Sequence, residues 1–355
     1  MKNKYLINGN FLCRSLTGIE RYAWEICRQL DALITPKDSF FLLAPRNAPA
    51  LPQLKNIKII QGKELKSFPY WDMIQFPAEC AKHRLTALNF SNTAPLGRRC
   101  GVSFIHDIYA FDCPEDFTTF RDKLVRLYSL LHYRNITRNA KLIITVSEFS
   151  KERIQNAFRT DSSRIAVIGN GWDHFKNIEE DNSIFTRFPV LSEKPYYFTL
   201  GSLSRRKNLK WIASYAQTHP EELFAISGKA ISGLVPQELQ SLQKLENVIL
   251  LGYVTDGEVK ALMRMCKAFV FPSYYEGFGI PPLEALSVGT RIIVSAAASL
   301  PEIYGSTASY IDPAKTDCNL EEILKEPVQD SETVLKAYTY KESARGLYEA
   351  LSLLP

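Results

Sequence analysis

The sequence predicts an α/β protein with two domains, each built on a parallel sheet. At 355 residues the chain is long enough for two such domains, each with its own core. Short apolar runs recur along it, separated by polar loops and by stretches with the spacing of one helical face. In the segment 271–289, FPSYYEGFGIPPLEALSVG, a strand passes through a glycine-bearing loop into a helix, as in nucleotide-binding domains.

The composition is ordinary for a soluble protein and carries a mild positive charge. Hydrophobic residues make up 46% and charged residues 23%, and the net charge is +5. This balance suits anionic ligands or an acidic membrane surface, and does not by itself argue for nucleic acid. Seven cysteines without a C-x-x-C pair argue against a disulfide framework and a zinc site. With no signal-peptide core and no long apolar run, the cytosol is the expected location.

The first half of the chain alternates expected strands with loops and helices. A strand at 5–7 is followed by a polar loop and by a helix over 20–33. Further strands are expected at 40–43, 57–60, 87–90, 101–105, 142–146 and 164–168. The strand at 101–105 ends directly in His106 and Asp107. Because ligands gather beyond the carboxyl ends of strands in open α/β sheets, this pair is well placed for a site.

A helix is expected over 121–141, where basic residues mix with leucines and tyrosines. A basic amphipathic helix can contact a membrane surface. An ordinary covering helix with a solvated charged face is the more common case, and we favour it.

The second half begins after a polar, charged stretch at 179–194, which predicts a linker. Strands are expected at 196–200, 223–227, 248–251, 268–271, 291–294 and 308–311, and helices over 256–266 and 319–324. The second domain therefore repeats the alternation of the first.

The segment 271–289 carries the residues that point to a ligand. Its glycines let backbone N–H groups approach a ligand closely, and Pro281 and Pro282 are expected to open the helix. A helix N-terminus is a natural seat for phosphate oxygens. Glu276 and Glu284 would repel a diphosphate placed there, so we assign them to hydroxyl groups on either side of it. Ribose and hexose both offer such hydroxyls, and the implied ligand is a nucleotide-sugar.

The string PSYYEGFGIPPLEAL, followed by SLPEI at 299–303, resembles the E-x7-E signature of retaining glycosyltransferases of family 4. That family has the GT-B fold, with two Rossmann-like domains facing each other across a cleft. The resemblance implies an acceptor-side domain over 1–178, with the last helix (338–355) packing back on it. It also implies a nucleotide-sugar-binding domain over 195–335.

The resemblance assigns residues in the first domain. The segment TGIERYAWEICRQL resembles the family's first loop and helix, which places Gly18 close to the donor diphosphate. A simple turn glycine remains the alternative there. The segment VSFIHDIYAFDCPEDF resembles the part of the family in which a histidine, here His106, lies beside the donor sugar and supports the reaction.

The loop GSLSRRKNLKW resembles the one that supplies cations to the donor diphosphate. Lys207 aligns with the family's lysine, and Arg206 is its expected companion. Many relatives have arginine where this chain has Ser202, so Arg205 stays open as the second cation.

The resemblance implies two catalytic residues, His106 and Glu276, which position and stabilise rather than act as nucleophiles. It implies the following donor-binding residues: Gly18, Arg206, Lys207, Gly228, Val254, Gly277, Phe278, Gly279, Ile280 and Glu284. Gly228 and Val254 follow strands whose ends lodge the nucleotide base in the family. No D-x-D pair for a metal ion and no P-loop pattern occurs in the sequence, so neither a metal nor a cofactor is expected.

The expected function is transfer of a hexose from a nucleotide-sugar to a glycan hydroxyl in bacterial surface polysaccharide synthesis. The motifs look most like mannosyl- and rhamnosyl-transferases of O-antigen or capsule, which points to GDP-mannose first and dTDP-rhamnose or a UDP-sugar next. The acceptor is then a glycan or a lipid-linked glycan, with a peripheral contact at the inner membrane face left open. Two alternatives remain: a sugar-nucleotide epimerase of GT-B fold, and a non-catalytic nucleotide-sugar-binding subunit.

Overall fold

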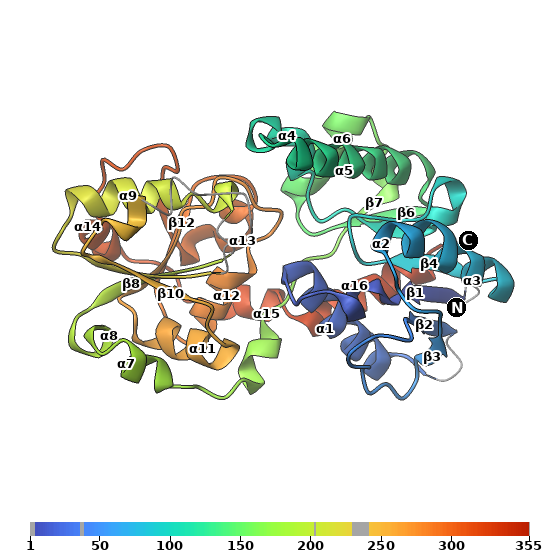
Figure 1. Cartoon of the computed structure of the whole chain (residues 1–355), viewed down its shortest axis with the longest axis horizontal. Helices are drawn as coiled ribbons and strands as arrows, with labels where there is room; N and C mark the ends of the chain where they lie inside the picture. The colour runs from blue at the N-terminus through green and yellow to red at the C-terminus, as the bar shows by residue number, and fades with distance from the viewer. Residues whose placement is uncertain (1–3, 36–38, 202–203, 229–240, 355) are drawn as a thin grey trace. The chain divides into compact units, whose positions relative to one another are not determined.

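The structure is a computed structural model that describes residues 4–35, 39–201, 204–228 and 241–354. Ser202 therefore lies outside the described residues. The chain folds into two compact units, one made of 1–171 with 338–355 and the other of 172–337. Each unit has its own parallel sheet with helices on both faces (Figure 1).

The first unit is built on a seven-stranded sheet in the order β3-β2-β1-β4-β5-β6-β7, with every pair parallel. The strands are β1 (Tyr5–Asn8), β2 (Phe40–Ala44), β3 (Lys58–Gln61), β4 (Thr86–Asn89), β5 (Val102–Phe104), β6 (Leu142–Thr145) and β7 (Ile165–Val167). The order of the strands reverses between β1 and β4. Their carboxyl ends form the switch point where such sheets bind ligands.

Helices cover both faces of this first sheet. The long helices α1 (Gly18–Leu33) and α16 (Tyr340–Ser352) pack together on one face. The other face is covered by α3 (Phe76–His83), α5 (Phe120–Asn139) and α6 (Glu148–Phe158). The short helices α2 (Phe68–Tyr70) and α4 (Tyr109–Asp112) lie in the connections. The last helix of the chain thus completes the core of the first unit.

The second unit is built on a six-stranded sheet in the order β10-β9-β8-β11-β12-β13, again with every pair parallel. The strands are β8 (Tyr196–Leu200), β9 (Leu223–Ser227), β10 (Val248–Gly252), β11 (Ala268–Phe271), β12 (Ile292–Ser295) and β13 (Ser309–Ile311). The helices are α7 (Ser183–Arg187), α8 (Val190–Glu193), α9 (Leu209–Thr218), α11 (Asp256–Met265), α12 (Ile280–Ser287), α13 (Leu300–Tyr304), α14 (Leu320–Lys325) and α15 (Glu332–Ala337). Here the strand order reverses between β8 and β11.

The predicted linker at 179–194 is wrong, because this stretch is folded into the second unit as α7 and α8. Ile184 and Leu191 are buried, and Arg187 forms an ion pair with Glu258 of α11. Of the charged residues that suggested a linker, Arg187 and Glu193 lie on these helices, whereas Glu179, Glu180, Asp181 and Lys194 lie in the connections beside them. The chain instead passes from the first unit to the second between residues 171 and 172.

Candidate functional site

Three predicted side chains meet where β8 and β11 end, at the switch point of the second sheet. The Lys207 Nζ lies 2.6 Å from Oε1 of Glu276, and an Arg206 guanidinium nitrogen lies 2.7 Å from Oε2. Burial would raise the pKa of the Glu276 carboxyl, but Arg206 and Lys207 outweigh it and hold that pKa below its usual range. The carboxylate is therefore ionised and fixes the direction of both cations.

The two loops that carry this cluster are tied to each other through the backbone. The Tyr274 N–H donates to the Arg206 carbonyl at 3.1 Å. Asn208, in the left-handed region at φ +57°, donates its side-chain amide to the Pro272 carbonyl at 3.1 Å. Gly201 ends the strand, and a Cβ there would lie 3.2 Å from the Lys207 side chain. The cations are thus held by the loop's conformation as well as by Glu276.

The glycine loop leads into α12 with fewer free donors than the sequence suggested. Ile280, rather than Pro281, is the first helical residue, so the two prolines occupy the second and third positions. Prolines have no N–H, which leaves the amides of Gly279 and Ile280 as the N–H donors at this helix start. The sequence predicts Glu284 in the first turn of the helix, but this residue is the fifth of α12 and lies beyond that turn.

The second sequence motif, SLPEI, supports this loop from behind. The Ser299 hydroxyl donates to the backbone carbonyl of Glu276 at 3.0 Å, and the Tyr304 hydroxyl donates to that of Gly279. Gly279 has φ +89°, and a Cβ there would lie 2.7 Å from Leu300 Cδ2. Any other residue would be strained at this positive φ, and its Cβ would displace the Leu300 side chain.

Glu284 has a partner that sequence reasoning missed. Its Oε1 lies 3.1 Å from Nε2 of His174, and both side chains are buried. His174 belongs to the 3-10 helix Asp173–Asn177, which packs against α12. His174 follows the GNGWD string at 169–173, and nothing in the sequence indicated which carboxylate the histidine would meet. Glu276 and Glu284 therefore have different partners.

Gly228 and Val254 follow β9 and β10, on the same edge of the second sheet. The Gly228 N–H donates to the Gly252 carbonyl at 3.1 Å, and Val254 is buried. Gly252 has φ +70°, and the ladder between β10 and β9 shifts register there. The predicted base-binding residues thus lie at an irregular edge where the backbone turns. Their role stays a prediction.

Two of the predicted residues, Gly18 and His106, belong to the first unit. Gly18 is the first residue of α1 and follows the N-cap Thr17. His106 follows β5 and is buried, with its Nε2–H donating to the Phe90 carbonyl at 2.7 Å. Burial lowers the pKa of the His106 imidazole, so the ring is neutral near pH 7 and Nδ1 carries its lone pair.

A buried polar network lies beyond β1 and was not predicted. The Asp72 carboxylate accepts hydrogen bonds from Asn8 at 2.9 Å, Asn10 at 2.8 Å and Thr93 at 2.9 Å. Burial nevertheless raises the pKa of Asp72. Asp72 lies on a π-helical segment, Trp71–Gln75, and such segments cannot be read from hydrophobic periodicity. The network fixes the loop that leads from β1 toward α1.

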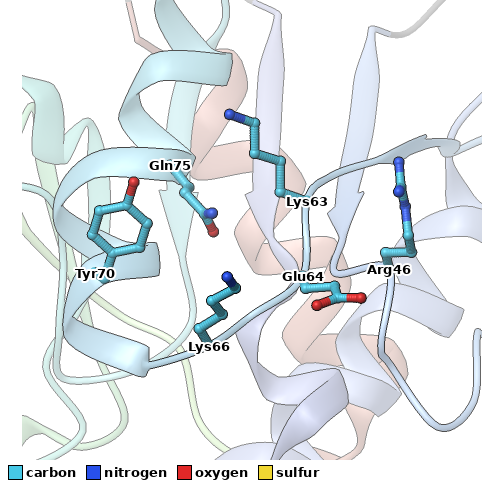
Figure 2. A pocket seen from close by; sticks show the side chains of 6 residues that line it. All are labelled: Arg46, Lys63, Glu64, Lys66, Tyr70 and Gln75. Atoms are coloured by element: carbon cyan, nitrogen blue, oxygen red, sulfur yellow. The ribbon is translucent and has the colours of Figure 1, made fainter.

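A hollow of about 340 Å³ in the first unit gathers positive charge (Figure 2). It is lined by Arg46, Lys63, Glu64, Lys66, Tyr70 and Gln75. The cations follow β2 and β3, so they lie at the carboxyl edge of the first sheet. None of the predicted site residues lines this hollow.

The helix α5 exposes an apolar stripe in addition to the solvated charged residues that had been expected. Five large apolar side chains of α5 are exposed, Val125 among them. We call the four that are spaced along one face the α5 stripe: Phe120, Leu124, Leu127 and Leu131. Phe120 is 78% exposed and the other three are 51–54% exposed. Only the C-terminal half of the helix is an ordinary covering element, with Tyr133 and Ile136 buried. Within the described residues, no helix combines the length and apolarity needed to cross a bilayer.

Two family models match the chain. The model described as "Glycosyltransferase Family 4" matches residues 16–174, and the one described as "Glycosyl transferases group 1" matches residues 181–343. The boundary between the two matches lies close to the passage between the two units.

Among proteins of similar sequence are O-antigen mannosyltransferases. The chain is 30% identical to O-antigen chain mannosyltransferase B of Escherichia coli over 258 residues, which is 70% of this chain and 65% of that protein. It is 26% identical to O-antigen chain mannosyltransferase RfbU of Salmonella typhimurium over 258 residues, 69% of this chain and 65% of that protein. It is 27% identical to serotype-specific mannosyltransferase WbdA of Escherichia coli, over 58% of this chain and 26% of that protein. The matches thus span slightly under two thirds of two of these relatives and about a quarter of the third.

Solved structures resemble the whole chain. Sucrose-phosphate synthase from Thermosynechococcus elongatus has a TM-score of 0.75 at 16% identity, with 99% of each chain covered. Anabaena HepE in complex with UDP and glucose has a TM-score of 0.68 at 18% identity, again with 99% of each chain covered. WaaG, a glycosyltransferase involved in lipopolysaccharide biosynthesis, has a TM-score of 0.67 at 16% identity, covering 99% of this chain and 96% of that one.

Proposed function

We propose that this chain, which belongs to the family 4 glycosyltransferases, transfers a hexose from a nucleotide-sugar to a hydroxyl of a glycan acceptor. The predicted family and the GT-B fold of two Rossmann-like domains are confirmed by the family models and the whole-chain likenesses. The observation that carries the proposed reaction is the cluster of Arg206, Lys207 and Glu276 beside the glycine loop of α12.

In the proposed reaction, negative charge builds on the departing diphosphate while the sugar becomes oxocarbenium-like. The Arg206 guanidinium and the Lys207 ammonium have five and three N–H groups, so these cations can bind phosphate oxygens as well as Glu276. The amides of Gly279 and Ile280 add two donors at the start of α12. Preorganised charge of this kind is a large term in stabilising a leaving group. Since these groups supply that charge, we propose transfer without a metal ion or a cofactor.

The proposed stereochemistry is retention by a front-face route, in which the leaving phosphate receives the proton of the acceptor hydroxyl. His106, being neutral, can accept a hydrogen bond from a sugar hydroxyl but cannot supply positive charge. We therefore assign it to positioning the donor sugar. Glu276 aligns the two cations and, beside them, stabilises the positive charge that develops on the sugar.

For the donor we propose GDP-mannose first, with dTDP-rhamnose or a UDP-sugar next. The names of the O-antigen mannosyltransferases support mannose, since the sequence likeness to them extends over most of this chain. The UDP complex of HepE concerns a chain of only 18% identity and supports no particular base here. The proposed acceptor is a glycan or lipid-linked glycan of surface polysaccharide synthesis.

A lipid-linked acceptor calls for contact with a membrane, and the α5 stripe suits that contact. Its four apolar side chains are surrounded on α5 by four exposed cations: Arg121, Lys123, Arg134 and Arg138. Apolar side chains beside cations bind the interface of an anionic bilayer through both burial and charge. We propose that the protein acts in the cytoplasm and that α5 holds it on the inner face of the membrane.

The proposed function is tested by thermal shift followed by transfer assays. GDP, UDP and dTDP are screened first, because a bound ligand raises the melting temperature. The sugar nucleotide of the strongest binder is then incubated with and without a lipid-linked glycan. Transfer that requires the acceptor, and that is lost in Glu276→Ala and Lys207→Ala, is the expected result. Conversion of the donor without acceptor would favour the epimerase instead, and binding without any conversion would favour the non-catalytic subunit.

A further inference from the structure

The close approach of His174 and Glu284 stands out because neither side chain lies on the surface. The exposed fractions are 4% for the His174 side chain and 11% for that of Glu284. Within the described part of the chain, the Glu284 carboxylate has no second hydrogen-bond or ion-pair partner. One carboxylate oxygen therefore lies against the imidazole at 3.1 Å without a hydrogen bond of good geometry, while the other keeps its capacity to accept hydrogen bonds.

The segment that carries His174 is itself fixed at both ends. The indole N–H of Trp172 donates to the Leu335 carbonyl at 2.8 Å. The Lys260 ammonium donates to the carbonyls of Phe175 at 3.1 Å and Ile178 at 2.7 Å. A side chain carried on a backbone anchored in this way can impose a direction on its partner, rather than follow it.

From this arrangement we infer that His174 is a positioning residue, which orients Glu284 to accept hydrogen bonds from hydroxyl groups of the nucleotide-sugar. The inference rests on the proposed function, and it names the residue that orients the hydroxyl-binding carboxylate of the donor site. A carboxylate can accept from two neighbouring hydroxyls at once, and both the ribose and the hexose offer such a pair. If His174 only filled space between Asp173–Asn177 and α12, its loss would weaken the fold without regard to hydroxyls.

The experiment compares ligands that differ in one hydroxyl, measured by titration calorimetry on the full chain. The variants are His174→Phe, which keeps a ring but no donor, and His174→Gln, which keeps an N–H donor. His219→Gln is the matched control, because His219 lies in the same unit and stacks on Tyr215 away from Glu284. The ligands are GDP, 2′-deoxy-GDP and GDP-mannose, with UDP and 2′-deoxy-UDP as a second pair.

We expect His174→Phe to weaken binding about ten-fold through the misdirected carboxylate, and His174→Gln to restore most of it. If the ribose is the target, the loss appears with GDP and disappears with 2′-deoxy-GDP. If the hexose is the target, GDP and 2′-deoxy-GDP are unaffected and GDP-mannose loses the affinity.

Equal losses for every ligand, or no loss in His174→Phe, would overturn the positioning role. A lower melting temperature of His174→Phe with wild-type affinities for all ligands would also overturn it, and would show that His174 only packs against its neighbours. Failure of the proposed function would be seen separately, in ligand binding by the wild-type protein. If the wild type binds none of the five ligands, the donor assignment and the inference both fall.

Discussion

Replacing Lys207 by methionine and Glu276 by glutamine is expected to move nucleoside diphosphate affinity in opposite directions. Two cations and one carboxylate give the cluster a charge of +1. Lys207→Met lowers this charge to zero, whereas Glu276→Gln raises it to +2. A diphosphate should respond to that charge, even though both variants should lose sugar transfer.

The sizes of the two changes in affinity follow from the interactions in the cluster. A hydrogen bond to a charged group contributes about 1.5–3 kcal/mol, so Lys207→Met should weaken binding roughly 10- to 150-fold. Glu276 lies 2.6 Å from the Lys207 nitrogen, which places a phosphate on that nitrogen at about 6 Å from the carboxylate. With an effective dielectric constant of about 40–80, removing the repulsion contributes about 0.7–1.4 kcal/mol. Glu276→Gln should therefore bind about 3- to 10-fold more tightly.

The assay is titration calorimetry of GDP and UDP at physiological ionic strength, since exposed charges are screened by salt. Lys210→Met is the matched control, because Lys210 is an exposed lysine three positions along the same chain segment. The affinities of Lys210→Met for GDP and UDP should equal those of the wild type. The reasoning is refuted if Glu276→Gln and Lys207→Met weaken binding alike, or if Lys207→Met matches the control.

Three further outcomes are expected. Replacing the α5 stripe by serines should abolish flotation with vesicles containing phosphatidylglycerol; wild-type protein that never floats with them would contradict the membrane contact. Gly279→Ala should weaken nucleoside diphosphate binding and lower the free energy of unfolding by more than about 1 kcal/mol. Gly289 is the control, because it has φ +83° but nothing lies within 4 Å of its Cβ, so Gly289→Ala should cost only the backbone strain. Equal losses of stability would contradict the clash with Leu300. Burial lowers the pKa of His132 to about 4 from 6.5. The neutral imidazole therefore stabilises the fold above pH 6.5, and this contribution to the free energy of unfolding, about 3 kcal/mol, is lost as the pH falls toward 4. Urea denaturation should show a flatter dependence of stability on pH in His132→Phe, and the same dependence as in the wild type would contradict this.

The strands of both sheets could be predicted because parallel sheets are buried on both faces. Strands such as β6 and β12 begin with three apolar residues and end at Thr145 and Ser295, a pattern that marks them without any knowledge of their partners. The π-helical segment Trp71–Gln75 gave no such signal, because its period departs from that of an α-helix. The stretch at 179–194 misled for a related reason: its buried positions are two isolated apolar residues among charges.

The sequence could identify the residues of the site, but it could not show which side chain each of them contacts. Lys207 and Glu276 are far apart in the chain, and they meet because β8 and β11 are adjacent in the sheet. Strand order is not visible in local patterns. For the same reason the sequence placed Glu276 and Glu284 together on sugar hydroxyls, whereas the fold gives the first to two cations and the second to His174.

A crystal structure of the full chain with GDP-mannose tests the central claim most directly. We predict diphosphate oxygens within hydrogen-bond distance of the Lys207 ammonium and the Arg206 guanidinium, with the Gly279 or Ile280 amide as a further donor. A diphosphate bound elsewhere, for example in the hollow of Arg46, Lys63 and Lys66, would contradict the account.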